Sequence, residues 1–166
     1  MCGASAALAA AIIAAGCGGG DEGSTSTTSS EPLGKQELIA KGDAICQQAR
    51  DRFAQLQGTP PTTPESAAAY AQKLITIQQT QLDQLRDLRA PSSLQSSLDD
   101  YLQALERNIA ILKQGLKAAQ QSDATGYAKA QAKAVTRQVQ RLELARAVGF
   151  KECSRPAGTA PGNTGS

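Results

Sequence analysis

The fold of this chain is decided by residues 93–119, which read SLQSSLDDYLQALERNIAILKQGLKAA. Apolar side chains recur there in steps of three and four, the spacing that places them on one face of an α-helix. The positions of this stripe are Leu94, Leu98, Tyr101, Leu105, Ile109, Leu112 and Leu116. The pattern is the strongest in the chain and predicts a helix that buries this face in a helical bundle.

Three further segments show helical spacing, and no stretch alternates over a useful length as a strand does. With the first segment, helices are expected over residues 35–57, 64–89, 93–119 and 123–148. Thr63 and Pro64 are a typical helix start, and Gly58 and Gly149 are typical helix ends. The last helix has a thinner apolar stripe, made up of Ala128, Ala132, Val135, Val139 and Leu142.

Helices of this length joined by short connections favour antiparallel neighbours. We therefore expect an all-α fold, an up-down-up-down antiparallel four-helix bundle over residues 35–153. An elongated pair of helical hairpins that dimerises is the alternative. Alanine-rich stripes bury little apolar area, and each Å² contributes only about 25 cal/mol. A covalent brace would therefore stabilise such a core.

The segment from Ala4 to Gly16 is small or apolar, too short to span a bilayer as a helix but suited to a secretory signal. Its end, Ala14-Ala15-Gly16-Cys17, resembles the lipobox of bacterial lipoproteins. The resemblance implies that residues 1–16 are a signal peptide and that Cys17 is lipidated. It also implies an extracytoplasmic protein, anchored to the bacterial cell membrane by this lipid.

Two segments are too poor in apolar side chains to fold. Residues 17–34, beginning with the lipidated cysteine, are expected to form a disordered tether, and residues 154–166 a disordered tail. The folded unit between them is expected to be one domain.

Cys46 and Cys153 are the thiols that remain if Cys2 leaves with the signal and Cys17 carries lipid. In an oxidising compartment we expect them to pair, with two separate buried thiols as the alternative. A disulfide closing so long a loop is worth about 4–5 kcal/mol in the chain-entropy model. Because Cys46 lies about three turns into the first helix, the chain must turn back at Gly149 and place Phe150 in the core.

The chain as a whole resembles a group of small bacterial secreted or lipoprotein helical domains. The resemblance is carried by the lipobox, the tether, Asp43-Ala44-Ile45-Cys46, Ala90-Pro91 and the spacing from Gly149 to Cys153. It covers most of the mature chain and implies location and fold. It brings no activity.

Composition excludes several function classes. Lys and Arg number 17 against 15 Asp and Glu, and Trp is absent, so no nucleic-acid footprint is present. There is no His and a single Met, so haem, copper and ordinary zinc sites lack their usual ligands. No motif pairs a nucleophile with a base. We expect no cofactor, no metal and no enzymatic activity.

Two sets of residues are candidates for binding. Lys129, Lys133, Arg137 and Arg141 follow one another at intervals of four and predict a basic ridge that contacts anionic lipid or acidic polymers. A solvated surface is the ordinary interpretation of such a ridge. Tyr70 and Tyr101 can line a pocket between helices, although simple core packing explains both positions.

These patterns predict a non-catalytic cell-envelope lipoprotein, a monomeric helical module that binds an envelope protein or polymer. The alternative is an extracytoplasmic protein that binds a small ligand in a pocket between its helices. A structural spacer is a third possibility.

Overall fold

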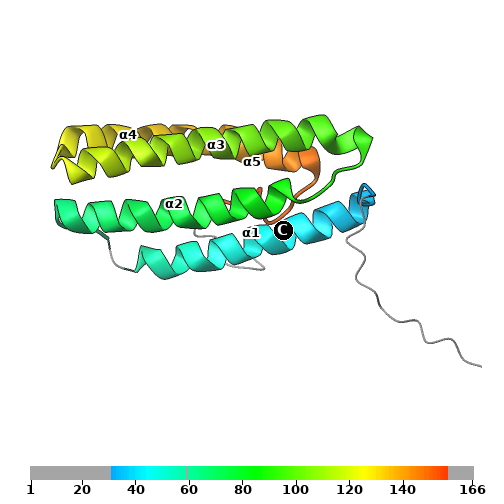
Figure 1. Ribbon diagram of the computed structural model, residues 1–166, viewed down its shortest axis with the longest axis horizontal. Helices are drawn as coiled ribbons and strands as arrows, with labels where there is room; N and C mark the ends of the chain where they lie inside the picture. Colours follow the sequence, from blue (N-terminus) through cyan, green and yellow to red (C-terminus); the bar gives the residue numbers. More distant parts are fainter. Residues whose placement is uncertain (1–30, 59, 157–166) are drawn as a thin grey trace, which may run out of the picture. The chain divides into compact units, whose positions relative to one another are not determined.

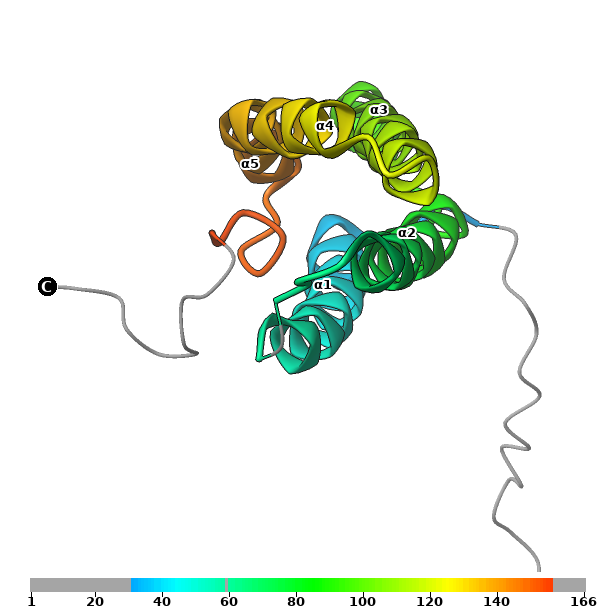
Figure 2. The same ribbon diagram turned by 90° about the vertical axis from the view of Figure 1, so that its left-hand side faces the viewer.

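Helix α3 lies at the centre of the packing. The computed structural model describes residues 31–58 and 60–156, and every regular element in them is a helix. The helices are α1 (Lys35–Gln57), α2 (Pro64–Arg86), α3 (Ser92–Gln120), α4 (Ala124–Thr136) and α5 (Gln138–Val148). In two views at right angles, α1 and α2 form one layer, and α3 forms the other with α4 and α5 (Figure 1 and Figure 2). The all-α prediction is confirmed.

Several predictions fall on residues outside this description. They are the signal peptide at 1–16, the lipidation of Cys17, the tether up to residue 30 and the tail from residue 157. Among the helices of residues 31–58 and 60–156, none is both long and apolar enough to span a membrane.

The stripe predicted on α3 is buried over most of its length. Its end positions Leu94 and Leu116 are half-buried and pack against the core. The positions between them are at most 6% exposed: Leu98, Tyr101, Leu105, Ile109 and Leu112. A second face of α3 carries small residues towards α4, where a Cβ on Gly115 would lie 3.3 Å from Ala130 Cβ. The glycine lets these two helices approach closely.

The ends of α2 follow from local chemistry. Thr63 Oγ1 accepts a hydrogen bond from Ser66 N at 3.2 Å, and Ser66 Oγ accepts one from Thr63 N at 2.9 Å. This reciprocal pair is a capping box. The helix ends at Arg86, earlier than the predicted residue 89. The carbonyl of Arg89 instead accepts a hydrogen bond from Leu33 N at 2.8 Å, just before α1 begins.

The segment predicted as one helix over 123–148 is helical, but a one-residue interruption divides it into α4 and α5. Arg137 lies in a turn between α4 and α5. Directly before the break, Thr136 Oγ1 donates a hydrogen bond to the carbonyl of Ala132 at 2.9 Å. Such bonds from threonine to the preceding turn can bend a helix slightly, but Thr76 and Thr80 make them within the uninterrupted α2.

The apolar stripe predicted for this segment is also wrong in most of its positions. Val135 is 66% exposed and Val139 is 63% exposed, and Ala128 and Ala132 are exposed as well. Of the stripe, only Leu142 is buried. The face that packs inwards is made up of Ala130, Leu142, Ala145 and Val148. The buried face of α5 is therefore rotated relative to the predicted one.

The chain turns back after α5, as predicted. Gly149 has a left-handed φ of 102°, and Phe150 is 1% exposed. The backbone amides of Lys151 and Glu152 both donate to Asp43 Oδ1 at 2.8 Å. The segment from Gly149 to Arg155, hereafter the C-terminal turn, is thereby fixed along α1.

Cys153 ends this path in the predicted disulfide with Cys46, with a Cα–Cα distance of 5.1 Å. The ring of Phe150 fills the place that a side chain at Gly42 of α1 would occupy. The same ring meets Tyr101 edge to face at a centroid distance of 5.9 Å. A covalent bond and an aromatic contact thus join the C-terminal turn to both layers.

The side between α1 and α5 is built differently from the other sides. α2 packs on α1 and on α3, and α3 packs on α4 and α5. Within the described residues, no packing of comparable extent joins α1 to α4 or α5. The C-terminal turn lies between the two helices and connects them instead (Figure 2).

Candidate functional site

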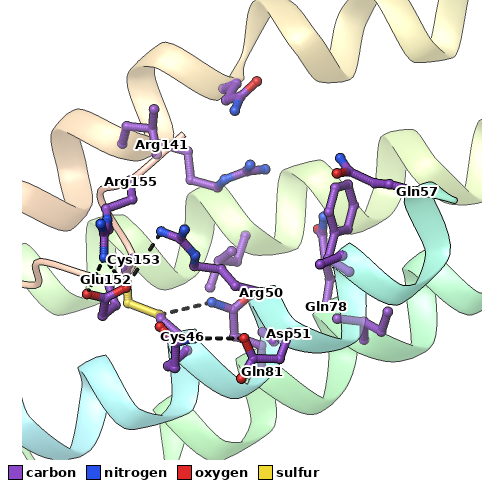
Figure 3. Close-up of a pocket in the computed structure, with 18 residues that line it drawn as sticks. Cys46, Arg50, Asp51, Gln57, Gln78, Gln81, Arg141, Glu152, Cys153 and Arg155 are labelled. Carbon is purple, nitrogen blue, oxygen red and sulfur yellow. Dashed lines mark hydrogen bonds and ion pairs between the residues drawn. A yellow bond between two sulfur atoms is a disulfide. The ribbon is translucent and has the colours of Figure 1, made fainter. Parts of the chain in front are cut away.

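A cavity of about 350 Å³ lies between α1 and α5. The size falls within the roughly 300–1,000 Å³ typical of small-molecule sites. Its lining comes from α1, α2, α3, α5 and the C-terminal turn, and the Cys46–Cys153 disulfide forms part of one wall (Figure 3). The predicted disulfide therefore also contributes to the lining of the cavity.

The apolar part of the lining, hereafter the apolar wall, comes from α1, α2, α3 and α5. It consists of Phe53, Ile77, Leu105 and Leu142, together with Ala49 and Ala54. Contact with these side chains removes apolar ligand surface from water, which favours binding at about 25 cal/mol per Å². The wall therefore suits the hydrocarbon part of a ligand.

Glutamines supply neutral polar groups around the same space: Gln47, Gln57, Gln78, Gln81 and Gln138. Several are fixed by the protein. Gln81 Nε2 donates to Cys46 Sγ at 3.1 Å, and Gln78 Oε1 accepts from Nδ2 of the buried Asn108 at 2.7 Å. Gln47 Nε2 donates to Asp51 Oδ1 at 2.7 Å. These bonds hold amide groups in fixed positions at the edge of the cavity.

Charged side chains gather at the C-terminal turn. Arg155 Nη1 lies 2.8 Å and 3.1 Å from the two carboxylate oxygens of Glu152. Arg50 Nη1 lies 3.6 Å from Glu152 Oε2. All three side chains are less than a quarter exposed, so water screens this cluster less than it would a surface ion pair. One carboxylate thus lies between two guanidinium groups.

Arg141 reaches into the cavity from α5 (Figure 3). Its side chain is half-buried, and four residues further on Ala145 is fully buried on the same face. Burial lowers the pKa of Arg141, and the neighbouring Tyr101 phenol raises it. With residues 31–58 and 60–156 as possible partners, its guanidinium forms no hydrogen bond and no ion pair.

The predicted basic ridge is therefore not continuous on the surface. Lys129, Lys133 and Arg137 are exposed, as expected. Arg141, the fourth residue of the predicted ridge, is half-buried and lines the cavity. Contact of this ridge with an anionic surface stays a prediction. Because the buried face of α5 is rotated relative to the predicted stripe, Arg141 turns towards the cavity.

The two tyrosines predicted to line a pocket do not line this one. Tyr101 is 1% exposed and lies in the core, with its hydroxyl 3.9 Å from Cys46 Sγ. Burial raises the pKa of Tyr101 to about 12, while nearby Arg141 acts in the opposite direction. Tyr70 is half-buried, and its pKa is raised by burial and by the proximity of Tyr127. Core packing therefore accounts for Tyr101.

A smaller hollow of about 230 Å³ lies between the start of α2 and the α3–α4 connection. Pro61, Pro64 and Tyr127 contribute to its lining, and Asp123 caps α4 beside it by accepting from Gly126 N at 2.8 Å. It contains no arginine or lysine. The cavity at α5 is the chemically richer of the two.

Sequence reasoning missed Arg50, Glu152 and Arg155. A signal was present, because Arg50 lies one helical turn after Cys46 and Glu152 directly precedes Cys153. The predicted disulfide therefore brings an arginine and a carboxylate to the same place. The glutamines gave no comparable signal, since they occur throughout α1 and α2.

No family model matches the chain, and no curated protein and no solved structure matches it either. Within residues 31–58 and 60–156, no group of three or more His, Cys, Asp or Glu side chains is arranged to hold a metal ion. The chemistry of the site rests on its arginines, amides and apolar wall.

Proposed function

We propose that the protein is a non-catalytic, extracytoplasmic binding module that takes a small molecule in the cavity between α1 and α5. The observation that carries this proposal is the cavity itself, which has a mixed lining and lies where helix packing is replaced by the C-terminal turn. Concave sites with an apolar wall and a few fixed polar groups are the usual form of ligand sites.

We also propose that the helices form an antiparallel up-down-up-down bundle. The connections between them are short, and Leu33, before α1, hydrogen-bonds Arg89, after α2. The chain colours of Figure 1 reverse direction from α1 to α2, from α2 to α3 and from α3 to α4, and α5 continues in the direction of α4. In this arrangement α4 and α5 together take the place of the fourth helix of the bundle, with the break at Arg137 between them.

The location is a proposal of the same kind. The disulfide between Cys46 and Cys153 favours an oxidising compartment outside the cytosol. Together with the lipobox-like Ala14-Ala15-Gly16-Cys17, it supports a lipoprotein held at the cell membrane by lipid on Cys17. The folded module then faces the extracytoplasmic space.

Native mass spectrometry of the full chain tests the binding proposal. The chain is expressed through an export pathway and purified without reductant. We expect a population heavier than the oxidised, lipidated polypeptide, with the added mass released on denaturation. Ala49→Phe fills the cavity and should abolish the added mass, whereas Ala44→Phe, on the exposed face of the same helix, should retain it.

A bare chain would argue against the proposal if it also takes up nothing from an organic extract of cell envelopes. Equal added mass on the two variants would place the bound molecule elsewhere. Far-UV circular dichroism of both variants controls for folding.

A second candidate is association with an envelope partner through the outer face of α4 and the start of α5. Two large apolar side chains, Val135 and Val139, are exposed there on either side of Arg137. Lys129 and Lys133 add positive charge. Charge reversal of Lys129, Lys133 and Arg137 should then reduce co-sedimentation with anionic vesicles or cell-wall polymer, and an unchanged association would exclude this face.

A further inference from the structure

The cavity holds one more cationic group than its own carboxylates neutralise. Glu152 lies between Arg50 and Arg155, with oxygen–nitrogen distances from 2.8 Å to 3.6 Å. The second carboxylate, Asp51, is exposed and accepts from Gln47. Arg141 is the guanidinium that neither carboxylate contacts.

Charged groups inside proteins are normally paired, because removal from water disfavours an isolated charge. Arginine keeps its charge in proteins, so Arg141 cannot avoid this cost by losing its proton. The guanidinium also presents its donors in a planar fork that fits two oxygens of one carboxylate. An anionic group that enters the cavity would find these donors free of protein acceptors within the described residues.

We infer that the cavity binds a monoanionic organic acid, with its carboxylate paired to Arg141 and its apolar body against Phe53, Ile77 and Leu142. The inference rests on the proposed binding function and names the class of ligand. It joins two independent observations, the half-buried guanidinium and the apolar wall of the same cavity.

The charges of the site favour one negative charge over two. A phosphate monoester carries about −1.5 to −2 at neutral pH. The guanidinium of Arg141 balances one unit of negative charge. Glu152 and Asp51 would repel the additional negative charge of a phosphate. A carboxylate therefore fits the site better than a phosphate.

Isothermal titration of the oxidised full chain with three probes of one chain length tests the inference. The probes are octanoate, its neutral analogue octanamide, and octyl phosphate. We expect octanoate to bind about ten- to a hundredfold more tightly than octanamide, the range of a charge-assisted hydrogen-bonded pair. Octyl phosphate should bind more weakly than octanoate.

Two variants locate the effect. Arg141→Gln should remove the preference for octanoate over octanamide, because octanoate loses its charged partner and its affinity falls to about that of octanamide. Arg137→Gln removes the same charge four residues earlier, on an exposed position that does not line the cavity. It should retain the full preference.

Different failures have different meanings. Equal affinity for octanoate and octanamide, or equal effects of the two variants, overturns the inference and leaves a cavity for neutral molecules. Tighter binding of octyl phosphate overturns the assignment of a single charge. If no probe binds but the native spectrum carries added mass, the inference alone fails. If no probe binds and the native spectrum is bare, the proposed function fails as well.

Discussion

The α2–α3 side and the α1–α5 side of the molecule are closed by different means. Between α2 and α3, buried leucines such as Leu82, Leu85 and Leu98 are at most 2% exposed and pack directly. Between α1 and α5, the Cys46–Cys153 disulfide, the ring of Phe150 and hydrogen bonds to Asp43 make the connection. Apolar side chains that pack directly fill the space between α2 and α3. Where the disulfide, the Phe150 ring and the hydrogen bonds connect α1 to α5, a cavity remains.

Removing the disulfide is expected to have the largest effect on this comparison. The Cys46→Ala, Cys153→Ala variant should lose about 4 kcal/mol of unfolding free energy, within the 2–5 kcal/mol usual for native disulfides. Urea unfolding of the variant and of the oxidised parent measures the difference.

Amide hydrogen exchange should show where the loss falls. We expect faster exchange in α5 and the C-terminal turn than in α2 and α3, because only the first pair depends on the brace. A loss below about 1 kcal/mol, or a uniform increase in exchange, would mean that both sides are closed by apolar packing.

Tyr101 lies where the two sides meet and provides a pH-dependent test. The tyrosine pKa is about 10 in an unfolded chain, and burial raises that of Tyr101 to about 12. The folded state therefore keeps the proton longer than the unfolded state. The stability is fully present below pH 10 and is lost as pH rises from about 10 to 12, by roughly 2–3 kcal/mol.

Unfolding free energies measured between pH 9 and 12 for the parent and Tyr101→Phe test this expectation. The variant should lack that part of the decline. Parallel curves would show that the Tyr101 phenol ionises equally in the folded and unfolded states.

Much of the connection between the C-terminal turn and the two helical layers could be predicted from the sequence. The regular spacing on α3 located the buried face, and counting the cysteines that follow the signal-like segment located the disulfide. Together they required the turn at Gly149 and a core position for Phe150. Such features depend on one helix or on one covalent bond, so a single pattern suffices to find them.

Gly42 is a feature that the sequence alone did not explain, and its substitution tests the packing of the C-terminal turn. Gly42→Ala should improve helix propensity by about 1 kcal/mol. The new methyl would overlap the buried ring of Phe150, and such overpacking costs about 1–3 kcal/mol. Subtracting the gain in propensity leaves an expected net loss of up to about 2 kcal/mol in the parent.

In the Phe150→Ala background the same change should become stabilising, because the ring is gone. A double-mutant cycle from denaturant unfolding measures this coupling. A coupling energy near zero would mean that the ring moves aside without cost and that the turn is loosely packed.

The cavity was harder to predict because it depends on how several elements pack. Val135 and Val139 fit a helical stripe by spacing, but α4 and α5 pack inwards through a different face, which leaves both valines exposed. The rotation that exposes these valines also turns Arg141 inwards. No sequence pattern within one helix predicts this rotation of the buried face, since it results from contacts between α3 and α5.

The smallest expected effect is a gain in stability at Arg141. If the α1–α5 side holds this guanidinium for a ligand, Arg141→Met should stabilise the ligand-free protein by about 0.5–1 kcal/mol, as changes that relieve a functional site often do. The melting temperature would rise by about 2–5 °C, whereas the exposed control Arg137→Met should change stability by less than about 0.5 kcal/mol. Saturating octanoate should reverse the order, because only the parent gains RT ln(1 + [L]/Kd) from the charged pair. A clear loss of stability in Arg141→Met without ligand would instead mean that the arginine stabilises the fold. The α1–α5 side would then serve the stability of the fold, as the α2–α3 side does, and not the binding of a ligand.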